Sequence, residues 1–128
     1  MAESTPSLDK LFRALADPTR LRILNLIADQ EICVCFFVDV LNEGQPKISR
    51  HLAYLRAAGI VDARRDGKWM HYKLLMPSDA NSAAILRATL KSLQHDPKMQ
   101  RDRERLNRAC CGPKSLVTQI GAPLPARA

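Results

Sequence analysis

The strongest structural signal in the chain is the stretch Gln45-Pro46-Lys47-Ile48-Ser49-Arg50-His51-Leu52-Ala53-Tyr54-Leu55-Arg56. Its apolar residues Ile48, Leu52 and Leu55 recur at helical spacing and form one stripe. Pro46 suits a first helical turn, where its missing N–H costs nothing, and Gly59 marks the end of the helix. The stretch therefore predicts a short helix with one apolar face and one face of hydrogen-bond donors.

The second face of this predicted helix is polar and basic. Its side chains are Gln45, Lys47, Ser49, Arg50 and His51. Side chains of this kind can contact base edges in the DNA major groove and the phosphates beside them. A solvated basic helix face without any partner is the alternative, and only the flanking elements distinguish the two.

Helical segments precede this stretch. Residues 7–16 have the spacing of one helix, and a second begins at Asp17-Pro18, an N-cap residue followed by a residue suited to the first turn. Segment 31–41 mixes β-branched and aromatic residues, so its composition fits either a helix or a strand. Its position, one turn (residues 42–44) before the basic helix, favours a short helix.

A hairpin follows the basic helix. The runs 60–65 and 68–74 flank Asp66-Gly67, which is a strong short-range hairpin signal. We expect its basic residues to contact the DNA backbone or the adjacent minor groove. They are Arg64, Arg65 and Lys68. Another helix follows, and a last, heavily charged helix is predicted from Pro97 to about Ala109.

The order of these elements predicts a mainly α fold with a β-hairpin wing. It is four helices, the hairpin, one more helix and the C-terminal helix, which is the order of a winged helix-turn-helix. We expect residues 1–96 to form the DNA-binding and dimerisation domain. Residues 97–111 form the charged helix that ends in Cys110-Cys111, and residues 112–128 are predicted to be a flexible tail.

Composition agrees with a nucleic-acid partner. The chain has 128 residues, a formal net charge of +7 and 46% hydrophobic residues, so it fits a globular domain that binds a polyanion. No apolar run is long enough to span a bilayer, and the N-terminus lacks the features of a signal peptide. We therefore expect a cytoplasmic protein. Its four cysteines are then better interpreted as ligands or redox sensors than as disulfides.

Three motifs resemble the ArsR/SmtB family of metal-responsive repressors. They are the segments 17–24 (DPTRLRIL), 45–52 (QPKISRHL) and 67–72 (GKWMHY). The resemblance implies a homodimer that occupies a palindromic operator until an inducer removes it, and it implies no enzymatic activity. It also implies a dimer interface built from the first and last core helices. Their apolar positions are Leu8, Leu11, Phe12 and Leu15, and Ile85, Leu86, Leu90 and Leu93. The alternative is that these residues fill the core of a monomer.

The segment Glu31-Ile32-Cys33-Val34-Cys35 resembles the cysteine box of the arsenite-responsive and cadmium/lead-responsive branches. In the arsenite branch a third cysteine often follows, and Val38 stands at that position here. The resemblance therefore implies As(III) or Sb(III) bound by Cys33, Cys35 and either Cys110 or Cys111. Cd(II), Pb(II) or Zn(II) bound by all four thiolates is the alternative.

The spacing of the two cysteines suggests a mechanism. In a regular helix, residues two apart point to roughly opposite sides, at about 100° per residue. We therefore expect one ion to bind both Cys33 and Cys35 only if the first helical turn is irregular or unwinds. Such unwinding would displace the basic helix and lower DNA affinity. A thiol redox switch, a structural zinc module and a thiol enzyme are the rival interpretations, and no glycine-rich anion loop accompanies the cysteines to support an enzyme.

Overall fold

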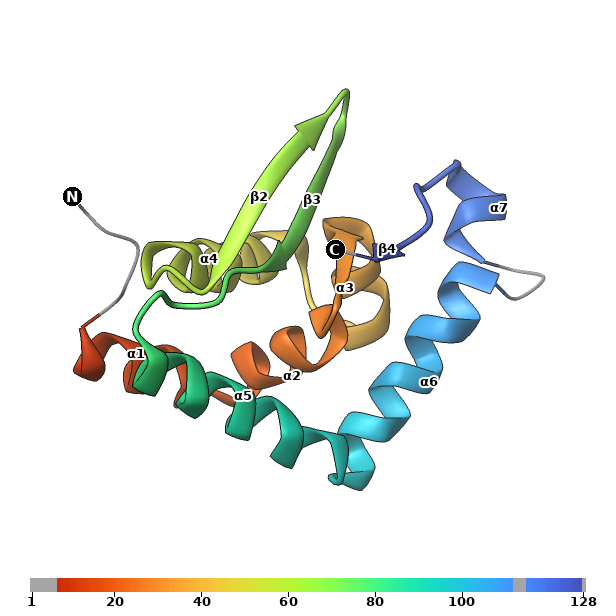
Figure 1. Ribbon diagram of the computed structural model, residues 1–128. Helices are drawn as coiled ribbons and strands as arrows, with labels where there is room; N and C mark the ends of the chain where they lie inside the picture. The colour runs from red at the N-terminus through yellow and green to blue at the C-terminus, as the bar shows by residue number, and fades with distance from the viewer. Residues whose placement is uncertain (1–6, 112–114, 128) are drawn as a thin grey trace.

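The computed structural model describes residues 7–111 and 115–127. Helices α1 (Leu8–Leu15) and α2 (Pro18–Ile27) come first, followed by strand β1 (Gln30–Cys33). Helices α3 (Val34–Leu41) and α4 (Gln45–Ala57) form the helix-turn-helix. Strands β2 (Val61–Asp66) and β3 (Trp69–Leu74) form a hairpin that projects from the helical body (Figure 1). The sequence prediction of a mainly α fold with a hairpin wing is confirmed.

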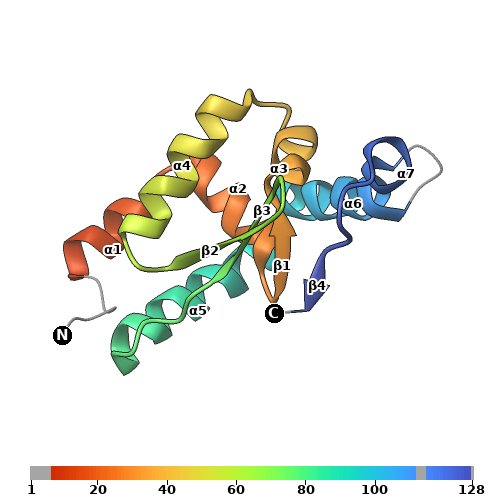
Figure 2. The ribbon, with the colours of Figure 1, turned by 90° about the horizontal axis from the view of Figure 1, so that it is seen from above.

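The remaining elements run toward the C-terminus. They are α5 (Ala80–Gln94), α6 (Pro97–Cys111), α7 (Leu116–Ile120) and β4 (Ala126–Arg127). Figures 1 and 2 both place α6 and α7 at the opposite end of the molecule from α1. Among the described helices, none has the length and apolar character needed to cross a membrane.

Local sequence signals start and end these helices as expected. The Asp17 carboxylate accepts a hydrogen bond from the Arg20 N–H at 3.0 Å and caps α2. Asp79 caps α5 in the same way, because its carboxylate accepts from the Ser82 N–H at 2.8 Å. Gly67 takes a positive φ of 61° at the tip of the hairpin, a conformation that glycine adopts without steric cost.

The core lies between α2, α3, α4 and the sheet. Phe36 and Phe37 of α3, Ile23 and Leu24 of α2 and Leu52 of α4 are all fully buried in one cluster. Helix α6 is joined to α2 by an ion pair in which Arg22 Nε lies 2.7 Å from Asp102 Oδ2. These contacts fix α3 and α4 relative to each other, which orients the basic helix.

One expectation about secondary structure was wrong. The segment predicted as a single helix over 31–41 begins as strand β1 and becomes helix α3 only at Val34. The segment predicted as a flexible tail, 112–128, contains helix α7 and strand β4 among its described residues. Ser115 caps α7 by accepting from the Thr118 N–H at 3.2 Å, and β4 then pairs with β1.

The sheet is antiparallel, with strand order β2-β3-β1-β4. Strand β1 lies in its interior, with Ile32 opposite Tyr72 and Cys33 opposite His71 of β3. On its other side, Glu31 of β1 lies opposite Ala126 of β4. The wing is therefore continuous, through β3, with the strand that carries the first cysteine.

Candidate functional site

Helix α4 presents a polar face to solvent. Ile48, Leu52 and Leu55 are fully buried, as predicted. The predicted DNA-reading residues Gln45, Lys47, Ser49 and Arg50 are all exposed. The Lys47 ammonium lies 3.2 Å from a Glu43 carboxylate oxygen in an exposed pair, which solvent weakens. The face therefore carries donors that can meet a base edge or a phosphate without displacing the protein core.

His51 differs from the other predicted DNA-reading residues because its side chain is only 17% exposed. Its Nδ1 lies 3.8 Å from Asp17 Oδ2 and 3.4 Å from an Arg20 guanidinium nitrogen. Burial lowers the pKa of His51 and favours the neutral ring. The structure therefore places His51 at the contact between the start of α2 and helix α4, and a DNA contact by His51 remains a prediction.

Arg20 is a positioning residue that the sequence interpretation did not single out. Its guanidinium donates to the carbonyl oxygens of Ala14 and Arg13 at 2.9 and 2.8 Å, which ties α2 to the end of α1. The same group lies over the Tyr54 ring of α4, 4.1 Å from the ring centre. The motif Asp17-Pro18-Thr19-Arg20 was the available signal, but it indicated a helix start and a family resemblance and not the role of Arg20.

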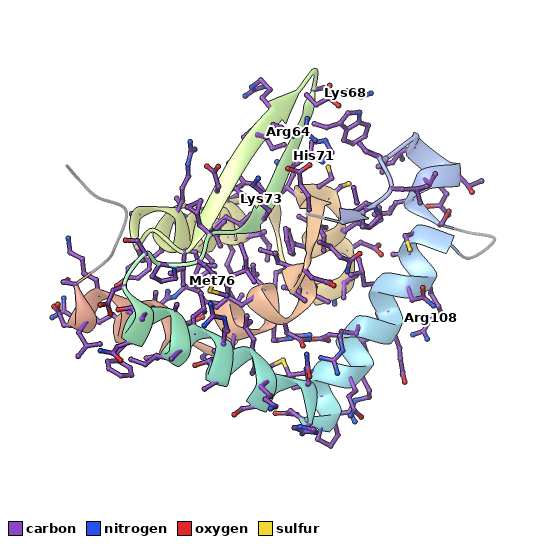
Figure 3. The ribbon with its side chains drawn as sticks, in the orientation of Figure 1. Arg64, Lys68, His71, Lys73, Met76 and Arg108 are labelled. Atoms are coloured by element: carbon purple, nitrogen blue, oxygen red, sulfur yellow. The ribbon has the colours of Figure 1, made fainter. Side chains whose placement is uncertain are left out.

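The wing carries the predicted basic residues on its exposed parts. Figure 3 shows Arg64 beside His71 and Lys68 near the tip, and Arg65 is exposed as well. The Lys68 ammonium lies 5.0 Å from the centre of the Trp69 ring. Arg64 has a carboxylate partner, because its Nη2 donates to Glu31 Oε1 at 2.6 Å. The three basic residues therefore stand in different electrostatic surroundings.

The two cysteines of the box occupy the junction between a strand and a helix. Cys33 is the last residue of β1 and has an extended backbone (φ −69°, ψ 145°), whereas Cys35 lies in the first turn of α3. Because Cys33 is not helical, the divergence expected of residues two apart in a regular helix does not apply to this pair. The Cys35 thiol donates toward the Cys33 sulfur over 3.2 Å. One ion can reach both sulfurs without any unwinding of α3.

This hydrogen bond separates the acidities of the two thiols. Donation from Cys35 lowers the pKa of Cys33 to about 6, an effect that burial opposes and the Met70 and Val34 backbone N–H groups reinforce. The same bond raises the pKa of Cys35, because it is lost when Cys35 ionises. Cys33 is therefore the more acidic of the two thiols, and the thiolate is the form that binds soft ions and acts as a nucleophile.

Of the two predicted third ligands, Cys110 is not brought to this pair. Cys110 lies half-buried near the end of α6, where its thiol donates to the Asn107 carbonyl at 3.3 Å. It also lines a cavity of about 270 Å³ together with Gln30 and Leu124. The side chain of Cys111 lies outside the described residues. Among the described side chains, no three His, Cys, Asp or Glu residues gather closely enough to hold a metal ion.

The fold and this surface define a class of protein. An exposed polar helix in a helix-turn-helix, followed by a basic hairpin, is the arrangement of a winged-helix DNA-binding regulator. A family model described as bacterial regulatory protein, arsR family, matches residues 17–63.

Comparison with known proteins shows which winged-helix regulators this chain is similar to. The chain is 47% identical over 78 residues to the arsenical resistance operon repressor of Escherichia coli (strain K12), covering 60% of this chain and 67% of that protein. It is 54% identical over 65 residues to an arsenic resistance transcriptional regulator of Pseudomonas putida, covering 50% of this chain and 51% of the relative. The structure of reduced HlyU from Vibrio cholerae N16961 matches with a TM-score of 0.58 and 30% identity, covering 69% of this chain and 88% of that one.

The chain belongs to the ArsR family. The family predicted from the motifs at residues 17–24, 45–52 and 67–72 is therefore confirmed. Proteins of this family regulate transcription, so the chain is a regulator and not an enzyme.

Proposed function

We propose that this chain is a repressor that occupies operator DNA as a homodimer and leaves it when a trivalent arsenical or antimonial binds. The observation that carries the proposal is the Cys33–Cys35 pair, whose sulfurs are 3.2 Å apart where β1, the strand that adjoins the wing, leads into α3. Two relatives, from Escherichia coli and Pseudomonas putida, are named for arsenical or arsenic resistance. A cytoplasmic location, where thiols stay reduced, belongs to the same proposal.

The DNA-facing roles divide between helix and wing. Gln45, Ser49 and Arg50 of α4 are proposed to contact base edges, and Lys47 and His51 to contact phosphates or to support the helix. Arg65 and Lys68 of the wing are proposed to contact the sugar–phosphate backbone or the minor groove. Exposure of all but His51 supports this division.

A homodimer through α1 and α5 is supported by apolar exposure on α1. Leu8 and Phe12 are 54% and 51% exposed, which a second copy would cover. Leu11 and Leu86 are fully buried within the protomer, so these two residues serve the core and not the interface. Two reading helices related by a two-fold axis would then match the two halves of a palindromic operator.

Ion capture needs a third thiolate, because As(III) takes three. Cys110 or Cys111, from the same or the other subunit, is the proposed source. Since Cys33 and Cys35 are already adjacent, the conformational change comes from bringing the third thiolate to them and not from joining the pair. By linkage, operator DNA must weaken inducer binding by the same factor by which the inducer weakens DNA binding.

Two other inducers remain as second candidates. A divalent ion, Cd(II), Pb(II) or Zn(II), would require all four thiolates. An oxidant such as a peroxide could instead remove two electrons and two protons from the two thiols to form a Cys33–Cys35 disulfide. The short sulfur–sulfur distance and the low pKa of Cys33 favour formation of this disulfide over oxidation of a single exposed thiol.

Release from operator DNA tests the proposal. A gel-shift assay is run with As(III), Sb(III), Cd(II), Pb(II), Zn(II) and hydrogen peroxide on the native chain and on four single Cys→Ser variants. We expect release by As(III) and Sb(III), its loss in Cys33→Ser and Cys35→Ser, and its loss in one of Cys110→Ser or Cys111→Ser. Whichever of Cys110→Ser and Cys111→Ser is still released by As(III) is the internal control. A Cys33→Ser/Cys35→Ser double variant that leaves DNA at the native arsenite dose would overturn the proposal.

A further inference from the structure

One row of side chains connects the cysteine pair to the wing. Cys33 of β1 lies directly opposite His71 of β3, and His71 lies directly opposite Arg64 of β2. Residues directly opposite each other in antiparallel strands place their side chains on the same face of the sheet, as do residues two apart on one strand. Glu31, Cys33, His71 and Arg64 therefore share one face.

Arg64 crosses this row to reach the strand of the cysteines. Its Nη2 and Nε donate to the two Glu31 carboxylate oxygens at 2.6 and 3.3 Å, so the pair is two-pronged. The Glu31 side chain is only 15% exposed, although that of Arg64 is 54% exposed. The ion pair thus joins β2, the outer strand of the wing, to β1 without involving the hydrogen bonds of β3.

His71 lies between the two joined strands and is 5% exposed. Its Nε2 is buried without a hydrogen-bond partner among the described residues, and an Asp66 carboxylate oxygen lies 3.9 Å from it. A buried ring packed between two strands transmits displacement by direct contact.

From this geometry we infer that Arg64 is a positioning residue of the wing and not a DNA contact, and that the Glu31–Arg64 pair links the wing to the cysteine site. The guanidinium is already matched by a carboxylate, so its attraction for phosphate is largely cancelled. The inference rests on the proposed function, because it gives the route by which ion capture at Cys33 reaches DNA. Movement of the end of β1 shifts Glu31, two residues away, and with it the hairpin.

A positioning role for the Glu31–Arg64 pair and a direct DNA contact by Arg64 predict opposite results for Glu31→Gln. If Arg64 contacted phosphate, removing the carboxylate would release its charge and tighten DNA binding. If the pair positions the wing, the same change weakens binding by up to about tenfold and leaves the salt dependence unchanged. Arg65→Gln is the matched control, since this neighbour is exposed and lies on the other face of the strand. It should lower affinity and reduce the salt slope by about one.

A charge exchange tests the pair itself. Arg64→Glu alone should weaken operator binding, and Glu31→Arg combined with Arg64→Glu should restore most of it. A direct phosphate contact by Arg64 predicts no recovery, because the wing would still carry a new negative charge. Circular dichroism of each variant confirms that it is folded, and only folded variants are compared.

A DNA-independent readout measures the link. Trp69, the single tryptophan of the chain, begins β3 and is half-buried. We expect sodium arsenite to change its fluorescence in the native full-length chain, and to change it at least about threefold less in Glu31→Gln. An equal change in both proteins, or tighter operator binding by Glu31→Gln, would overturn the inference. If the native protein stays bound to its operator in the presence of arsenite, the proposed function fails. The salt-slope and charge-exchange results still decide the role of Arg64.

Discussion

Helix α4 and the Cys33–Cys35 junction differ in how their residues depend on one another. In α4 the buried residues Ile48, Leu52 and Leu55 lie on one face and the exposed donors on another, so packing and binding use different side chains. At the junction, Cys33 belongs to a strand, Cys35 to a helix, and each thiol sets the acidity of the other.

The difference shows which changes can be made independently. A substitution on the outer face of α4 should alter DNA binding alone, and one on its inner face should alter stability alone. A substitution of either cysteine at the junction should affect more than one property, because the two sulfurs share one hydrogen bond. The following predictions test this contrast.

The largest expected effect is on stability. Leu52→Ala removes a fully buried side chain from the core and should lower the free energy of unfolding by about 2–5 kcal/mol. Ser49→Ala, three residues earlier on the exposed face, should change it by less than about 0.5 kcal/mol. Denaturant unfolding of both variants measures the contrast, and similar losses for the two would show that the faces of α4 are not separable.

The next effect is on thiol acidity. Cys35→Ala removes the donor that stabilises the Cys33 thiolate, so the pKa of Cys33 should rise from about 6 by about one to two units. At neutral pH the thiolate fraction of Cys33 then falls, and ion capture weakens beyond the loss of one ligand. Ultraviolet thiolate absorbance, taken as the difference from the matching variant that also carries Cys33→Ser, follows the titration.

Cys35→Ser is the control for that titration. Its hydroxyl can still donate to Cys33, so the pKa of Cys33 should stay closer to the native value than in Cys35→Ala. An unchanged pKa of Cys33 in Cys35→Ala would mean that the backbone N–H groups near Cys33 stabilise its thiolate and that the Cys35 thiol does not.

A smaller effect is expected on DNA discrimination. Arg50→Ala should lose about 1–3 kcal/mol of preference for operator over unrelated DNA, because a base contact carries sequence information. Its stability should stay native, since Arg50 is exposed. Competition binding with operator and scrambled duplexes, together with thermal unfolding, measures both quantities.

The smallest effect is expected at the wing tip. Lys68→Ala should weaken binding to operator and scrambled DNA alike and reduce the salt slope by about one, as the loss of one phosphate contact does. Equal losses of sequence preference in Lys68→Ala and Arg50→Ala would contradict the division of roles between helix and wing.

Local sequence patterns were sufficient to predict the elements whose residues are proposed to contact DNA. Pro46 and the spacing of Ile48, Leu52 and Leu55 placed α4, and Asp66-Gly67 placed the hairpin. These signals work because each helix cap or turn depends on residues close in sequence. Exposure of the donors on α4 followed directly from the position of its apolar stripe.

Features that depend on distant pairing were not predictable in this way. Segment 30–33 is a strand because β3 and β4 pair with it, and no local sequence pattern predicts those partners. That strand conformation is what brings the sulfurs of Cys33 and Cys35 together. The ion pair between Glu31 and Arg64 joins residues far apart in sequence, so charge pattern alone suggested DNA for Arg64.

The pairing of Ala126 with Glu31 has a consequence for how the protein is handled. Unpaired β-strand edges recruit other chains, and here residues 126 and 127 cover one edge of β1, the strand that carries Cys33. Removing residues 115–127 would uncover this edge. We expect protein that lacks these residues to self-associate, so DNA-binding measurements are best made with residues 115–127 present.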